Sequence, residues 1–175
     1  WMSMAAAATA APNLTFLTGI AVAFPVSPMI AASLAWELAG QTGGRFRLGL
    51  GSQVRAHVER RYGMHFDPPG PRMRDYLLAV QDALAAFRGD RPLDHDGPFY
   101  RLSLLPDMWR PPRHSFGDIK VDVSAVGPWM TAMAGEVADG VHVHPLHSLA
   151  YLQNRLLPAV QAGAPDRQGI EERTE

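Results

Sequence analysis

Residues 14–28 read Leu-Thr-Phe-Leu-Thr-Gly-Ile-Ala-Val-Ala-Phe-Pro-Val-Ser-Pro, and this stretch decides the fold class. Residues 14–24 are apolar at both alternating sets of positions, which is typical of a strand buried on both faces in a parallel sheet covered by helices. Ser27 and Pro28 then mark a helix start, an N-cap residue followed by proline at the first helical position. The sequence therefore predicts a strand that leads directly into a helix.

The same order of strand and helix recurs along the chain. Further strands are expected at residues 45–50, 119–125 and 141–144, and helices at 28–39, 53–62, 73–87, 128–139 and 149–162, the last kinked or divided at Pro158. The Pro- and Gly-rich residues 90–118 show no periodicity and are expected to form a long loop. Four alternating units indicate an α/β fold with parallel strands, whereas a closed eight-stranded barrel needs about 250 residues.

Composition limits the possible functions of these 175 residues. The net charge of −1 argues against a nucleic-acid partner, and the absence of cysteine excludes disulfides and thiolate metal sites. A secretory signal has basic residues before its apolar core, but the first 44 residues contain no Lys or Arg. No apolar run is long enough for a membrane span. We expect a cytoplasmic protein that acts on a small molecule without a membrane partner. Its expected parts are an irregular segment at 1–13, a domain at 14–162 and a polar tail at 163–175.

Three groups of residues are candidates for a functional site. Gly127 and Pro128 follow a strand and open a helix, which indicates either a phosphate site or a plain turn. His142, His144 and His147 have spacing that suits either a metal-dependent hydrolase or a strand end beside a polar pocket. His57 lies on a short polar helix, as part of a ligand-binding rim or of a solvated face.

Five motifs in order resemble the luciferase-like monooxygenase superfamily, flavin and deazaflavin enzymes built on a (β/α)8 barrel. The motifs lie at 18–24 with 27–29, at 43–51, at 97–100, at 126–128 and at 134–140. Residues 53–63, with His144 and Pro145, resemble a branch that depends on coenzyme F420. The resemblance implies a partial TIM barrel, about four parallel βα units of the eight.

The resemblance also implies a function and places its residues. The activity would be hydride transfer between coenzyme F420, with FMN as the alternative, and an organic substrate. In relatives, the strand that matches Gly19 and Ile20 carries a non-proline cis peptide that backs the flavin ring. The turn that matches Val126, Gly127 and Pro128 holds the cofactor phosphate, and His57 falls where a polar side chain meets the cofactor. His144 would lie at the barrel mouth, as the candidate catalytic residue.

The chain departs from the family pattern in two ways. Members of the family have two βα units before Leu14 and two more after Ala162, so we expect this chain to be a truncated, central portion of such an enzyme. Open strand edges would then favour a homo-oligomer, and an inactive half-barrel or assembly fragment is an alternative function. In addition, Lys120 and Asp122 stand where an evenly apolar strand is expected.

Overall fold

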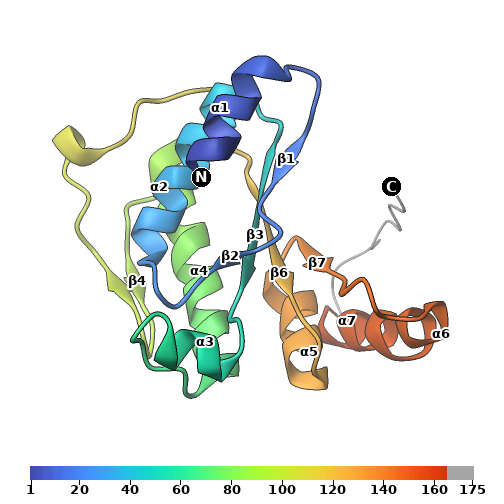
Figure 1. Ribbon diagram of the computed structural model, residues 1–175. Helices are drawn as coiled ribbons and strands as arrows, with labels where there is room; N and C mark the ends of the chain where they lie inside the picture. Colours follow the sequence, from blue (N-terminus) through green and yellow to red (C-terminus); the bar gives the residue numbers. More distant parts are fainter. Residues whose placement is uncertain (165–175) are drawn as a thin grey trace.

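A parallel sheet lies at the centre of the molecule, and the computed structural model describes it within residues 1–164 (Figure 1). Five strands of the described residues form this sheet: β1 (Phe16–Leu17), β2 (Ala21–Val22), β3 (Phe46–Gly51), β6 (Lys120–Ser124) and β7 (Gly140–His142). Their order is β1-β3-β6-β7, and β2 also pairs with β3. Because β1 and β2 occupy the same side of β3, the sheet has four strand positions, all parallel. This arrangement confirms the predicted α/β fold.

Helices connect the strands and supply the covering layer. The described helices are α1 (Met2–Ala10), α2 (Pro28–Thr42), α3 (Arg55–Arg60), α4 (Pro69–Arg88), α5 (Pro128–Val137), α6 (Leu149–Tyr151) and α7 (Leu157–Gly163). Helix α2 begins at Pro28 as predicted, and it ends at Gly43 in the left-handed conformation (φ 63°) that glycine adopts without steric cost. Helix α4 ends in the same way at Gly89 (φ 84°).

The two faces of the sheet differ in character. Leu48 and Leu50 of β3 and Val121 and Val123 of β6 are buried in the hydrophobic core with residues of α2, α4 and α5. Alternate residues of the same strands point to the opposite face, which we call the inner face. It carries a set of small and polar residues: Arg47, Gly49, Gly51, Asp122, Ser124, Gly140 and His142.

The predicted irregular segment at 1–13 is wrong, because Met2–Ala10 forms helix α1. Its sequence is rich in alanine, which has the highest intrinsic helix propensity. The helix packs along α2, where Ala8 is buried and the Gln41 side-chain amide donates a hydrogen bond to the Ala5 carbonyl (2.9 Å). The predicted polar tail begins one residue too early, since Gly163 ends α7, and residues 165–175 lie outside the described part of the chain.

The single strand predicted over residues 14–24 is two short strands instead. Between them the Thr18 hydroxyl takes over the pairing with β3, donating to the Gly49 carbonyl (2.7 Å) and accepting from the Gly49 N–H (2.9 Å). A side chain thus replaces backbone partners at this point of the ladder. The Gly19–Ile20 peptide bond in the same interval is cis, as the family resemblance predicts.

Two further regions differ from the sequence-based expectation. The loop predicted at 90–118 contains an antiparallel hairpin of β4 (His95–Asp96) and β5 (Arg101–Leu102) and a 3₁₀ turn at Asp107–Trp109. Strands of two residues are too short to give a periodic signal. The predicted terminal helix contains a π-helical segment, Leu152–Leu156, just before Pro158. Proline has no N–H to donate to the preceding turn, which explains the local break from α-helical bonding.

No helix within residues 1–164 has both the length and the apolar character needed to cross a lipid bilayer.

Candidate active site

The carboxyl ends of the parallel strands lie together at one end of the sheet, near α3 and the start of α5 (Figure 1). We call this end the carboxyl edge, as distinct from the outer strands β1 and β7. Parallel α/β sheets bind their ligands at this edge. Ile20 lies there, since a side chain built on Gly51 would meet its Cδ1 at 2.8 Å and the Ser124 Cβ at 3.4 Å. Gly51 therefore makes room for Ile20 between β2 and β6.

A partly buried ion pair occupies the inner face of the sheet. Arg47 donates from Nε to Asp122 Oδ2 (2.8 Å) and from Nη2 to Asp122 Oδ1 (2.6 Å). This hydrogen bonding raises the pKa of Arg47, although partial burial works in the opposite direction. A side chain on Gly140 would lie 2.6 Å from Asp122 Oδ1, so glycine on β7 leaves the space that the pair fills. Of the two charged residues that interrupt the expected apolar strand, Asp122 is thus neutralised by Arg47. The other, Lys120, donates to the exposed Asp118 (3.1 Å) instead.

His142 lies beside this ion pair at the end of β7. Its Nε2 is buried, has no hydrogen-bond partner within residues 1–164, and lies 3.9 Å from Asp122 Oδ2. A side chain on Gly49 would come within 2.3 Å of the same nitrogen, so the imidazole occupies the space above Gly49. Buried polar atoms are nearly always paired, and an unpaired one indicates a water or ligand contact. His142 is therefore a residue of the candidate site, although its sequence pattern indicates only a metal ligand or a pocket wall.

The turn at Val126, Gly127 and Pro128 places an open helix N-terminus at the same edge. Gly127 is the N-cap of α5 and Pro128 its first residue, as predicted. A side chain built on Gly127 would meet no atom within 4 Å, so the space beside this turn is free. The Tyr151 hydroxyl donates to the Val126 carbonyl (2.8 Å) and fixes the turn against α6. First-turn N–H groups without intrahelical acceptors and the positive helix end suit a phosphate group.

The remaining predicted site residues are less closely tied to this edge. His57 is exposed on α3, directly after β3. His144 lies in the exposed loop after β7, which ends at His142 rather than at residue 144, and its Nδ1 accepts a hydrogen bond from the Leu146 N–H (3.2 Å). The ring of His147 lies 5.7 Å from that of His144 and 4.3 Å from that of Tyr151.

The three histidines do not converge on one point. Within residues 1–164, no group of three or more His, Asp or Glu side chains is arranged to hold a metal ion. His142 faces Asp122, whereas His144 lies near His147, whose ring lies beside that of Tyr151. The geometry therefore gives no support to the metal-dependent hydrolase.

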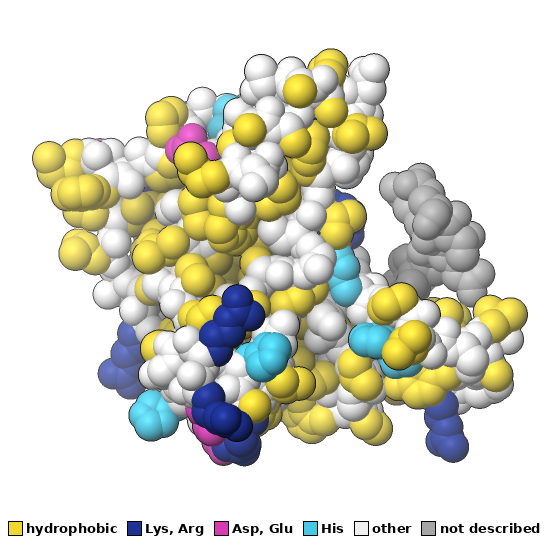
Figure 2. Space-filling model, in the orientation of Figure 1, with side chains coloured by type: hydrophobic (Ala, Val, Ile, Leu, Met, Phe, Trp, Pro, Cys, Tyr) yellow, Lys and Arg dark blue, Asp and Glu magenta, His cyan; other side chains and the backbone are white. Residues whose placement is uncertain are grey.

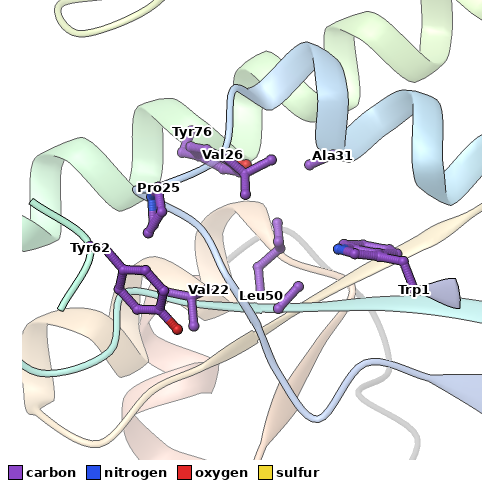
Figure 3. Close-up of a pocket in the computed structure, with 9 residues that line it drawn as sticks. Trp1, Val22, Pro25, Val26, Ala31, Leu50, Tyr62 and Tyr76 are labelled. Carbon is purple, nitrogen blue, oxygen red and sulfur yellow. The ribbon is translucent and has the colours of Figure 1, made fainter. Parts of the chain in front are cut away.

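A separate cavity of about 200 Å³ lies between the sheet and the helices α2 and α4 (Figure 3). None of the residues predicted to bind the cofactor lines it. Its walls are apolar and aromatic: Trp1, Ala21, Val22, Pro25, Val26, Ala31, Leu50, Tyr62 and Tyr76. Hydrophobic side chains gather over this part of the surface, and basic side chains gather at the end formed by α3 (Figure 2).

Comparison with known proteins decides the family. The sequence pattern of the luciferase-like monooxygenases matches residues 1–170. The chain belongs to the luciferase-like monooxygenase family. It is therefore a member of an enzyme family, as the motifs predict.

Two relatives from one organism are similar to a large part of this chain. An uncharacterized protein of Mycobacterium tuberculosis is 39% identical over 146 residues, covering 83% of this chain and 43% of the relative. A second protein of that organism, provisionally named a coenzyme F420-dependent oxidoreductase, is 34% identical over 65% of this chain and 34% of its own length. The chain thus spans less than half the length of these relatives.

A solved structure confirms the fold. The coenzyme F420-dependent tetrahydromethanopterin reductase of Methanopyrus kandleri matches with a TM-score of 0.74 at 22% identity. The match covers 93% of this chain and 48% of the reductase. The four strand positions observed here thus correspond to about half of a related α/β enzyme, in agreement with the predicted partial barrel.

Proposed function

We propose that the protein takes part in hydride transfer between coenzyme F420, with FMN as the alternative, and a small organic substrate. The observation that carries this proposal is the open N-terminus of α5 at Gly127, at the same sheet edge as Ile20 and His142. The name of the 34%-identical relative and that of the reductase with the matching fold favour F420. No nucleic-acid partner is expected for a chain with a net charge of −1.

The residues at this edge fit such a cofactor. The free space at Gly127 and the unpaired N–H groups of the first turn of α5 would hold a phosphate, with Val126 and Pro128 shaping the turn. Gly19 and Ile20 would support the ring, and His57 would offer a polar contact from α3. When bound, the cofactor would supply the hydride-carrying ring, and the protein would orient it and exclude water.

Cofactor titration of the purified chain tests this proposal. Both cofactors absorb and fluoresce, so each can be titrated separately, and we expect saturable binding with F420 preferred over FMN. A preference for FMN would replace the F420 assignment but keep the flavin-type site. Absence of binding by both cofactors, in a preparation whose circular dichroism shows the folded α/β protein, would contradict the assignment of this edge.

We propose as a second function that copies of the chain assemble through the outer strands of their sheets, β1 and β7. Within the described residues, β1 pairs only with β3, and β7 pairs only with β6, so both edges are unpaired. Leu17 on β1 is 48% exposed, so this edge presents an apolar side chain at the surface. Unpaired edges with apolar side chains favour pairing with another chain. A homo-oligomer, active or inactive, would cover these unpaired strands. The cytoplasmic location expected from the sequence stays a prediction.

A further inference from the structure

Within residues 1–164, the hydrophobic core and its helices lie on one face of the sheet. Leu48 and Val121 pack there with residues of α2, α4 and α5. On the inner face, Leu17 is 48% exposed and the Arg47 side chain is 37% exposed. Leu17 belongs to this face because it is the register partner of Arg47. All-parallel sheets occur almost only where both faces are covered, by helices or by closure into a barrel, so the inner face requires a cover.

The two outer strands of the sheet are complementary to each other. Within the described residues, β1 pairs only with β3 and β7 only with β6, and all pairs are parallel (Figure 1). Rotation of a second copy by half a turn about an axis along the strands preserves the strand direction. In that arrangement β7 of each copy meets β1 of the other in parallel. The order β1-β3-β6-β7 then occurs twice around a ring, which gives the strand number of a closed (β/α)8 barrel.

From this arrangement we propose that two copies of the chain form one closed barrel, in which the inner face of each copy covers that of the other. The proposal rests on the assembly through outer strands proposed above and specifies its geometry. Since all strands point the same way, the two carboxyl edges form a single mouth, with Gly127 of each copy beside it. A site at this mouth is complete only in the dimer, because barrel sites are built from loops around the whole ring.

The side chains of the inner face suit burial inside such a barrel. Arg47 is paired with Asp122, and Lys120, at the amino end of β6, is paired with Asp118. Closure of the barrel therefore brings no unpaired Lys, Arg, Asp or Glu of these strands into its interior, where such a charge would be costly. Leu17 would lose its contact with water, and burial of this apolar surface favours the dimer.

Two measurements on the unchanged chain test the closed barrel. Contacts between unlike edges either close into a ring or continue into open chains of copies, and a closed barrel leaves no outer strand free. Sedimentation velocity at increasing concentration should therefore show a dimer and no larger species. In a mixture of isotope-labelled and unlabelled chains, filtered nuclear Overhauser measurements report only contacts between copies. These contacts should join backbone protons of β1 to backbone protons of β7.

A pair of matched variants separates closure from simple pairing of edges. Ser124 lies on the inner face of the central strand β6 and is partly exposed, so an open arrangement of sheets would leave an arginine there in water. A closed barrel would bury the new charge, and Ser124→Arg should weaken the dimer about tenfold or more. Ser103→Arg is the control, because Ser103 is exposed and lies outside the central sheet. Circular dichroism shows whether both variants fold.

Each other outcome counts against a defined part of the proposal. Backbone contacts between two β1 strands or between two β7 strands would keep the assembly but overturn the closed barrel. Oligomers that grow beyond the dimer, or equal effects of the two serine substitutions in folded proteins, would overturn it as well. An unchanged chain that stays monomeric at every concentration would overturn both the barrel and the assembly on which it rests.

Discussion

Asp75 and His95 form a buried contact between helix α4 and the β4–β5 hairpin, with Asp75 Oδ1 3.0 Å from His95 Nε2. The second oxygen of Asp75 accepts hydrogen bonds from the backbone N–H groups of Phe99 (2.8 Å) and Tyr100 (2.9 Å). The other ring nitrogen of His95 lies 2.7 Å from Asp82 Oδ2. One carboxylate therefore fixes β4 and the hairpin turn to the helix.

Asp75→Ala is expected to destabilise the protein by about 3 kcal/mol, because it leaves a buried imidazole and two backbone N–H groups without their acceptor. Urea unfolding followed by circular dichroism measures the change. Asp96→Ala is the matched control, since its ion pair with Arg101 is exposed and exposed pairs contribute little. Equal free energies of unfolding for the two variants would contradict this account of the hairpin.

Gly49→Ala is expected to destabilise the sheet by about 2 kcal/mol or more, the range for overpacked interiors. Its Cβ would lie 2.1 Å from the Thr18 carbonyl oxygen and 2.3 Å from His142 Nε2. The Thr18 backbone cannot yield easily, since its hydroxyl is bonded to both polar groups of Gly49. The loss should therefore persist in a His142→Ala background. Full recovery of thermal stability there would show that only the imidazole obstructs the new side chain.

The Arg74–Glu136 ion pair between α4 and α5 should give a small pH-dependent contribution to stability. Both side chains are about half exposed, and Arg74 Nε lies 3.2 Å from each Glu136 oxygen. Hydrogen bonding to Arg74 lowers the pKa of Glu136 below its ordinary 4.5. The contribution is therefore present above pH 4.5 and is lost as the pH falls through the lowered folded-state value.

The expected size of this contribution is about 0.5 kcal/mol, typical of an exposed pair. The difference in free energy of unfolding between the unchanged protein and Glu136→Gln, measured at several pH values, reports it. The difference should be present at neutral pH and disappear in acid. A difference that grows as the pH falls would have the wrong sign.

Much of the fold could be predicted because its signals are local. Ser27 and Pro28 mark the start of α2, and the apolar spacing of Met73, Tyr76 and Leu77 marks α4. Sequence reasoning did not find the interruption of the first strand by the Thr18 hydroxyl, because that bond spans 31 positions. It missed helix α1 although the alanine run was a usable signal.

The candidate site could be predicted only in part, because some of its contacts join residues that are distant in the sequence. Gly127 and Pro128 stand at a junction that the sequence itself defines, and the structure places them as predicted. The role of Asp122 could be suspected only as an irregularity in an apolar strand, since its partner Arg47 is 75 residues away. His142 showed as part of a histidine pattern, but its burial against Gly49 depends on two neighbouring strand pairings.

Gly127→Val tests the phosphate position without disturbing the fold. The residue has φ −76°, which any amino acid adopts, and free space where a side chain would project, so thermal stability should not change. If the cofactor phosphate approaches the α5 N-terminus, the new side chain should weaken F420 binding about tenfold, or about 1.4 kcal/mol. Fluorescence titration measures the affinity. Unchanged affinity in a protein of unchanged stability would remove the phosphate from this turn.

Self-association through the β1 edge gives the last prediction. Leu17 is the exposed apolar residue of that edge, and a lysine there would introduce a charge that neighbouring chains could not bury. Sedimentation velocity at increasing concentration should show oligomers of the unchanged chain and a shift toward monomer for Leu17→Lys. Leu104→Lys is the control, because Leu104 is still more exposed but lies outside the sheet. If both substitutions release monomers equally, general surface hydrophobicity drives association, and a monomeric unchanged chain would remove the edge proposal altogether.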